Sequence, residues 1–98
     1  MSKSVRTRAH DAVVAVLVAA RLEAGLTQRD LADRLPRWLG WLHTTVAKVE
    51  TRRRAMSFVE VREYAAVLGL DVATVDKRAS DLAAGRGGPK AKRPRSKA

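Results

Sequence analysis

A chain of 98 residues, 46% hydrophobic and 31% charged, favours one small folded domain over a disordered chain. The absence of cysteine excludes disulfides, thiol catalysis and zinc–thiolate sites, and two histidines leave no cluster for a catalytic metal. The formal net charge of +10 predicts an anionic partner, and nucleic acid is the first candidate.

The positive charge is concentrated at the two ends of the chain. Residues 85–98 carry six basic side chains and no acidic one, and residues 1–10 carry three basic ones. Residues 11–84 hold eleven basic and ten acidic side chains, so this part is nearly neutral. The pattern predicts a basic N-terminal arm (1–7), a folded domain (8–84) and a disordered basic tail (85–98) that is rich in Gly, Pro and charge.

The first predicted helix covers residues 8–24, and Gly25 ends it. Its helical spacing predicts an apolar stripe of Val13, Leu17, Ala20 and Ala24. The apolar run 12–20 follows basic residues, as in a secretory signal, but it is far shorter than the roughly 20 residues that span a bilayer. Asp11 at its border and the absence of a clean cleavage site also argue against a signal. We therefore expect a cytoplasmic protein.

The next two helices are predicted to be short and separated by an aromatic connection. Thr27 and Asp30 form a start similar to a capping box, and Pro36 ends or kinks the second helix. Residues 36–42 (PRWLGWL) connect to a third helix over residues 44–51. This connection contains both tryptophans of the chain.

Two further helices complete the predicted domain. Ser57 and Glu60 form a capping box for the fourth helix, which Gly69 closes, and Asp71 caps the fifth. The predicted inward faces are Phe58, Val61, Ala65 and Leu68 in the fourth helix, and Val72, Val75, Ala79 and Leu82 in the fifth. The sequence contains no repeat and no convincing strand, so it predicts an all-α, compact five-helix bundle.

Three segments in this order carry a family resemblance: residues 25–32 (GLTQRDLA), 44–50 (TTVAKVE) and 65–70 (AAVLGL). Together they resemble the Cro/C1-type (Xre-like) helix-turn-helix family over about residues 14–75. The resemblance implies a lambda-repressor-like DNA-binding fold. It also implies a sequence-specific transcriptional regulator of double-stranded DNA, a repressor that binds its operator as a homodimer.

One departure from the family pattern is an insertion between the two motif helices, around residues 36–41. It leaves the angle between these helices open. The longer segment resembles regulators from high-GC Gram-positive bacteria and their phages. A composition of 14 Arg, 6 Lys and 17 Ala, with no Ile or Asn, is consistent with an actinobacterial or phage origin.

The resemblance places base-reading residues at the start of the third helix. They are His43, Thr44 and Lys48, with Thr45 beside them. Lysine donates to guanine O6 and N7, and a threonine methyl can contact the thymine methyl. The helix offers no Asn or Gln for adenine, so we expect a G-containing half-site. An exposed turn position without base contact is the alternative for His43.

Phosphate-binding residues are implied on both sides of that helix. In the family the residue matching Gln28 contacts a phosphate at a helix N-terminus, and Thr27 caps the same helix. The full set is Thr27, Gln28, Arg29, Arg52, Arg53 and Arg54. Taken alone, an arginine run is usually a solvated surface, and the resemblance is what favours phosphate contact here.

Several residues have structural interpretations. The resemblance makes Glu50 an internal hydrogen-bonding residue. Trp38 and Trp41, three residues apart, are interpreted as a local core that fills the enlarged turn, with a partner surface as the alternative. Tyr64 and Phe58 are expected in the core.

Two other function classes remain open. An architectural protein would coat DNA through its two basic arms, with little sequence preference. An antitoxin or adaptor would bind a protein partner through the region of Trp38 and Trp41.

We expect no enzyme, cofactor, metal or small-molecule substrate. The sequence contains no nucleophile–base pair or carboxylate dyad, and the glycines of residues 85–88 lie outside any strand–helix context for a nucleotide fingerprint. The predicted fifth helix and the apolar face of the first are the candidates for a dimer surface.

Overall fold

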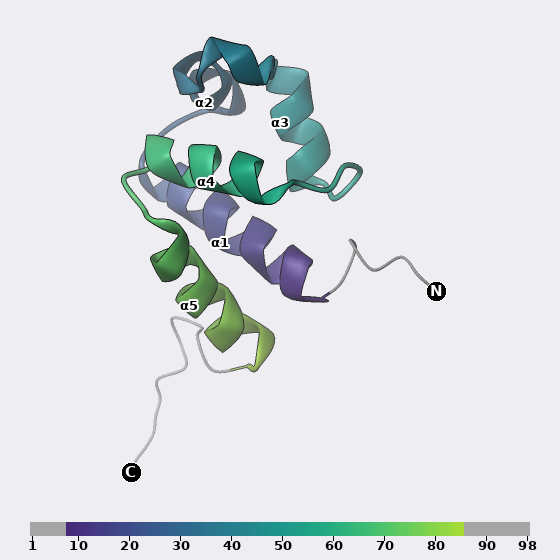
Figure 1. The fold of residues 1–98 in the computed structure, drawn as a ribbon, viewed down its shortest axis with the longest axis vertical. Coiled ribbons are helices and arrows are strands. Elements are labelled where there is room, and N and C mark those ends of the chain that lie inside the picture. Colours follow the sequence, from purple (N-terminus) through teal and green to yellow (C-terminus); the bar gives the residue numbers. More distant parts are fainter. Residues whose placement is uncertain (1–7, 86–98) are drawn as a thin grey trace.

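The computed structural model describes residues 8–85, which form five α-helices, one 3₁₀ turn and no strand (Figure 1). The elements are α1 (Arg8–Glu23), α2 (Gln28–Arg34), η2 (Arg37–Leu39), α3 (His43–Glu50), α4 (Phe58–Val67) and α5 (Val72–Ala83). The predicted all-α, five-helix architecture is confirmed. The predicted arm at residues 1–7 and the tail from residue 86 onward lie outside the described residues.

The helix starts follow the capping pattern of the sequence. Thr27 Oγ1 accepts a hydrogen bond from the N–H of Asp30, and the Asp30 carboxylate accepts one from the N–H of Thr27. Ser57 and Glu60 form the same reciprocal pair before α4, and Asp71 accepts from the N–H of Thr74 in α5. Each cap satisfies a backbone donor that the first helical turn leaves unpaired. The three predicted capping sites are therefore confirmed.

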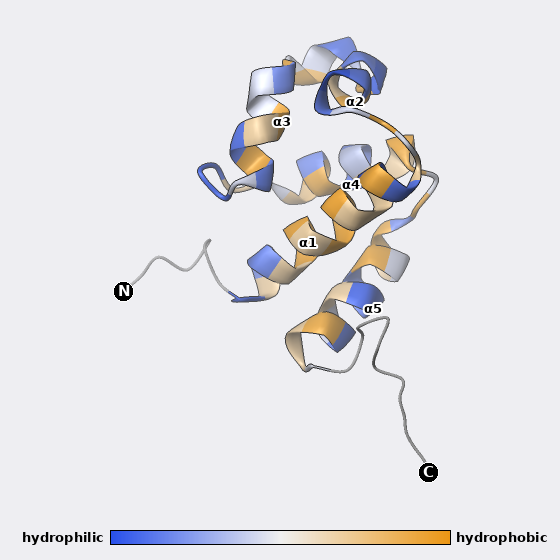
Figure 2. Cartoon of the chain, turned by 180° about the vertical axis from the view of Figure 1, so that it is seen from behind, coloured by the Kyte–Doolittle hydropathy of each residue, from blue (hydrophilic) through white to orange (hydrophobic). Residues whose placement is uncertain are grey.

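The core is built around α1. Ala12, Val14, Val16 and Leu17 are buried, and Figure 2 colours α1 as hydrophobic along most of its length. The predicted stripe is confirmed at Leu17 and wrong at Ala24, which is exposed, while Val13 and Ala20 are half-buried and Val13 packs against the core. Since α5 and α3 both pack against α1, the helix has no single inward stripe. Neither α1 nor another helix in residues 8–85 is long and apolar enough to cross a lipid bilayer.

The two C-terminal helices bury their middles and expose apolar residues near one end. Tyr64 and Ala65 of α4 are buried, as are Val75 and Ala79 of α5. Phe58, expected in the core, is 64% exposed because it is the first residue of α4 and lies before the buried turns of the helix. Leu82, near the end of α5, is 40% exposed. The core prediction is therefore confirmed for Tyr64 and wrong for Phe58, and the predicted inward face of α5 is wrong at Leu82.

Candidate nucleic-acid interface

Helix α3 is buried along one face and exposed along the other. Val46 and Val49 have no exposed surface, whereas Thr44 and Lys48, one helical turn apart, are exposed. With α2, the helix forms one end of the molecule, at the top of Figure 1. Two of the predicted base-reading side chains therefore lie on a common outward surface.

The other two predicted base-reading residues are engaged with their neighbours. The Nε2 atom of His43, a half-buried residue, lies 3.5 Å from Nη2 of Arg29. Thr45 Oγ1 accepts a hydrogen bond of 3.3 Å from the N–H of Leu42, which immediately precedes α3. Thr45 thus stabilises the start of the helix, while His43 connects it to α2.

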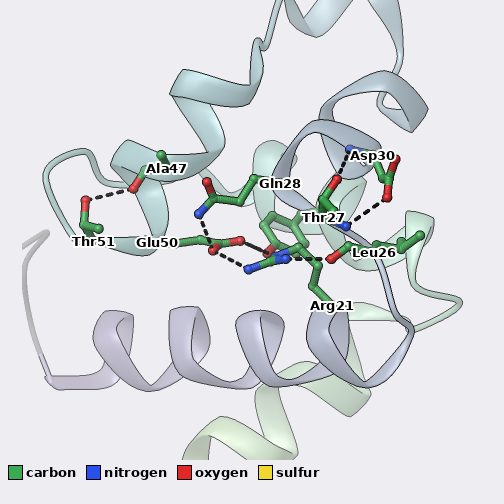
Figure 3. Close-up of polar contacts among 9 residues, drawn as sticks. Arg21, Leu26, Thr27, Gln28, Asp30, Ala47, Glu50 and Thr51 are labelled. Carbon is green, nitrogen blue, oxygen red and sulfur yellow. Dashed lines mark hydrogen bonds and ion pairs between the residues drawn. The ribbon is translucent and has the colours of Figure 1, made fainter.

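The last residue of α3, Glu50, joins four helices through its carboxylate (Figure 3). Arg21 of α1 donates from Nε to Oε2 at 2.8 Å and from Nη2 to Oε1 at 2.9 Å. Tyr64 of α4 donates to Oε2 at 2.6 Å, and Gln28 of α2 donates from Nε2 to Oε1 at 3.0 Å. The expectation that Glu50 is an internal hydrogen-bonding residue is confirmed.

This cluster of Arg21, Gln28, Glu50 and Tyr64 is well shielded from solvent. The side chains of Arg21 and Glu50 are 8% and 6% exposed. Burial by itself raises the pKa of Glu50, but the hydrogen bonds from Arg21, Tyr64 and Gln28 outweigh it and bring the pKa below its ordinary value. Burial, followed by the bond to Glu50, raises the pKa of Tyr64. The carboxylate is therefore ionised and the phenol protonated at neutral pH.

The sequence did not reveal the partners Arg21 and Tyr64. A usable signal exists, because Arg21 follows Leu17 by one helical turn and so falls beside the predicted apolar stripe, where a buried guanidinium needs a carboxylate. Arg21 Nη1 also donates to the carbonyl of Leu26 at 2.6 Å, so it fixes the loop before α2 as well.

The predicted phosphate-binding residues of α2 make internal bonds yet keep hydrogen-bonding capacity. An amide group has two N–H donors, and only one from Gln28 bonds to Glu50. The Thr27 hydroxyl accepts from the N–H of Asp30, which leaves its own hydrogen to donate. Arg29 is exposed beside His43. All three retain donors for an anion.

The arginine run after α3 divides into three different environments. Arg54 donates to both carboxylate oxygens of Glu60, at 3.0 and 2.9 Å, and lies 5.3 Å from the ring centroid of Trp41. Arg52 Nε is 3.3 Å from Asp11 Oδ1. Arg53 is exposed, and its side chain has no hydrogen bond or ion pair within residues 8–85.

Arg52 and Arg54 are therefore engaged in ion pairs within the fold. The bond from Arg54, opposed in part by burial, lowers the pKa of Glu60 to about 2. A phosphate contact by Arg54 stays a prediction, for which Nε–H and the second N–H of Nη2 remain available beside this pair. Arg53 is the arginine of the run best placed to meet an external anion.

The aromatic connection buries one tryptophan and exposes the other. Trp41 is 8% exposed and lies against Arg54, whereas Trp38 in η2 is 66% exposed. The expected local core is confirmed for Trp41 and wrong for Trp38. Gly40, with a φ of 73°, takes the left-handed conformation that ends η2, so the chain changes direction between the two indoles.

The end formed by α2 and α3 is also the positive end of the described chain. Residues 26–54 contain seven basic and three acidic side chains, and residues 55–85 contain three basic and five acidic ones. Arg34 and Arg37, which the sequence analysis did not single out, are exposed at the end of α2 and in η2. Clusters of exposed cations on one surface are the electrostatic signature of nucleic-acid binding.

A different kind of surface lies between α1, α4 and α5. A groove of about 530 Å³ is lined mainly by apolar side chains, with His10 and Asp76 as its titratable groups. Across residues 8–85, no three His, Asp or Glu side chains gather as a metal ion would require.

Comparison of the chain with protein-family models, characterised proteins and solved structures finds no match. A functional assignment therefore depends on the residues and the geometry described above.

Proposed function

We propose that this protein is a sequence-specific transcriptional regulator that binds double-stranded DNA and represses transcription in the cytoplasm. The supporting observation is the construction of α3. One face of the helix is buried and tied through Glu50 to α1, α2 and α4, while Thr44 and Lys48 lie exposed on the other. A reading helix needs this combination, because base contacts require side chains that are held in a fixed position.

The dimensions and chemistry of α3 suit the major groove. Its eight residues make a helix about 12 Å long, and the groove admits an α-helix. Lys48 donates to guanine O6 and N7, and Thr44 presents a methyl group and a hydroxyl to the base edges. Arg53, Gln28 and Thr27 hold the phosphates on either side, which fixes the register of the helix on the duplex.

In this proposal α2 and α3 are the two helices of a lambda-repressor-like helix-turn-helix motif. The extra residues of the connection form η2 and the turn at Gly40, so the lengthening adds a small structured element between the helices. The support comes from the order of the five helices, from the contact between α2 and α3, and from the resemblance of residues 25–32 and 44–50 to the family pattern.

We also propose that the protein binds its operator as a homodimer. Of the two candidate dimer surfaces, the apolar face of α1 is covered within the chain by α5 and α3. The exposed side of α5, which includes the 40% exposed Leu82, is therefore the better candidate. A two-fold arrangement of this kind presents two α3 helices to two half-sites.

Selection of binding sites from random duplexes tests the proposal. The full-length protein, its Lys48→Ala variant and a chain shortened after Ala84 are compared, with circular dichroism as the control for folding. We expect a short, two-fold-related motif with the full-length and shortened chains, bound at least about 10³-fold more tightly than random DNA. Absence of a motif, with binding lost on removal of the tail, would favour the architectural alternative.

A further inference from the structure

The connection from α2 to α3 exposes two large hydrophobic side chains. Trp38 is 66% exposed and Leu42 is 65% exposed, whereas Trp41 is 8% exposed. Trp38 belongs to η2, and Leu42 is the residue immediately before α3. Exposed apolar groups beside a proposed binding surface are candidates for contact with a ligand.

The fold does not need Trp38 to fill the turn. Leu35 and Trp41 are buried there, and Leu39 packs partly against the core. Trp38 has no hydrogen bond, ion pair or ring contact within residues 8–85. Its indole N–H is therefore a donor whose partner must be water or another molecule.

The surroundings of Trp38 are cationic. Arg34 and Arg37 are exposed at the end of α2 and in η2, and Asp33 is the acidic residue of this segment. Arg37 and Leu42 line a common hollow of about 330 Å³, which brings η2 next to the start of α3. Asp33 also lines this hollow, and Trp38 lies next to Arg37 in η2, so the indole and the guanidinium group belong to the short element that leads into the proposed reading helix.

We propose that Trp38, together with Arg37, contacts the sugar–phosphate backbone of duplex DNA beside the groove that α3 enters. The inference rests on the proposed function. The apolar face of the indole packs against deoxyribose, its N–H donates to a phosphate oxygen, and Arg37 pairs with a phosphate. The insertion between the motif helices thereby adds affinity that carries no base preference.

A second copy of the chain is a poorer occupant of this surface. Trp and Arg often anchor protein interfaces, but a two-fold dimer brings the same patch of each subunit together. Arg34 and Arg37 of both copies would then face one another and repel. The polyanionic backbone of DNA instead neutralises these cations.

Binding of labelled duplexes to the full-length protein, followed by fluorescence anisotropy, tests the contact. Trp38→Ala is compared with Phe58→Ala, because Phe58 is 64% exposed and lies on α4, away from η2. We expect Trp38→Ala to weaken binding about tenfold on both the selected and a random duplex of equal length. Phe58→Ala should leave both affinities unchanged.

Tryptophan fluorescence gives a second, direct readout. In the Trp41→Phe variant Trp38 is the remaining tryptophan, and we expect the duplex to protect it from quenching by acrylamide. If Trp41→Phe does not fold, the protection that is present in the wild type and lost in Trp38→Phe reports the same contact.

The outcomes separate this inference from the proposed function. If the wild type and Trp38→Ala bind the duplexes with equal affinity and the duplex does not protect Trp38, the proposed contact is wrong. DNA binding by the protein would then still stand. Protection that rises with protein concentration in the absence of DNA would overturn it in favour of a second copy. Failure of the wild type to bind any duplex would instead contradict the proposed function.

Discussion

The α2–α3 end (residues 26–54) and the α4–α5 end (residues 55–85) differ in the balance of their exposed charges. At the α4–α5 end the exposed cations Arg62 and Lys77 lie beside Glu63 and Asp81. At the α2–α3 end the exposed side chains of Arg37, Lys48 and Arg53 have no such neighbour within residues 8–85.

The difference comes from the number of carboxylates, which is three at the α2–α3 end and five at the α4–α5 end. Asp30 caps α2 and Glu50 joins four helices, so two of the three acidic side chains of the α2–α3 end serve the fold. Cationic side chains such as Arg37, Lys48 and Arg53 remain exposed to solvent. The α2–α3 end therefore has few free carboxylates to offset its exposed cations, and such a positive surface attracts polyanions.

The largest effect is expected from removal of the internal carboxylate. Glu50→Ala leaves Arg21 buried without a counter-charge, and we expect the free energy of unfolding to fall by about 3–5 kcal/mol, measured by urea denaturation. The control is Glu63→Ala at the other end, where an exposed pair with Arg62 contributes about 0–1 kcal/mol. Equal losses in the two variants would show that Glu50 has no special role.

Removal of Lys48, the lysine proposed to read bases, should reduce sequence preference, whereas removal of a lysine at the α4–α5 end should not. Lys48→Ala should reduce the preference at one base position by about 1–3 kcal/mol, measured by competition between duplexes that differ at single positions. Lys77→Ala removes the same charge from α5 and should leave the preference unchanged. A uniform loss across all duplexes in Lys48→Ala would assign Lys48 to the phosphates instead.

Protonation of Glu50 and Glu60 at low pH should weaken the contacts that join the α2–α3 end to the α4–α5 end. The pKa of Glu60 is lowered to about 2, mainly by its bond from Arg54, and the pKa of Glu50 is also lowered. A carboxyl group with a depressed pKa in the folded state stabilises it above the unfolded pKa, and this stability disappears as the pH falls through the folded pKa.

We therefore expect a progressive loss of stability between about pH 4.5 and pH 2, of which Glu60 accounts for about 1–2 kcal/mol. Unfolding in urea as a function of pH measures it. Glu60→Gln should be less stable at neutral pH and should show a shallower dependence in this range. An unchanged slope would contradict the assigned role of the Arg54–Glu60 pair.

The smallest effect is expected from a single phosphate contact. Arg53→Ala should weaken binding to all duplexes alike and reduce the slope of log affinity against log salt by about 1. Arg78→Ala, which removes an exposed arginine from α5, should leave the slope unchanged. Similar slopes in both variants would show that position on the molecule does not matter and would favour delocalised electrostatic attraction.

Local signals in the sequence predicted the helices well. Thr27, Ser57 and Asp71 mark helix starts because a short polar side chain satisfies the free N–H groups of the first turn. Packing was less predictable. Periodicity assigns one inward face to a helix, so it failed for α1, which is covered on more than one side, and for Phe58 in the first turn of α4.

The candidate site could be predicted only in part from the sequence, for a similar reason. The family resemblance singled out Thr44 and Lys48 in α3, but the hydrogen bonds to Glu50 join residues distant in the chain. The separate environments of Arg52, Arg53 and Arg54 likewise depend on Asp11 and Glu60. Trp38 and Trp41 look alike in the sequence, and the turn at Gly40 separates them.

The most direct test of the proposed interface is amide chemical-shift mapping of the full-length protein during titration with a short duplex that carries the selected site. We expect the largest shifts in α3, at the start of α2, in η2 and around Arg53, with small changes in α4. Shifts confined to residues 86–98, with α3 unchanged, would contradict the proposal that α3 reads DNA.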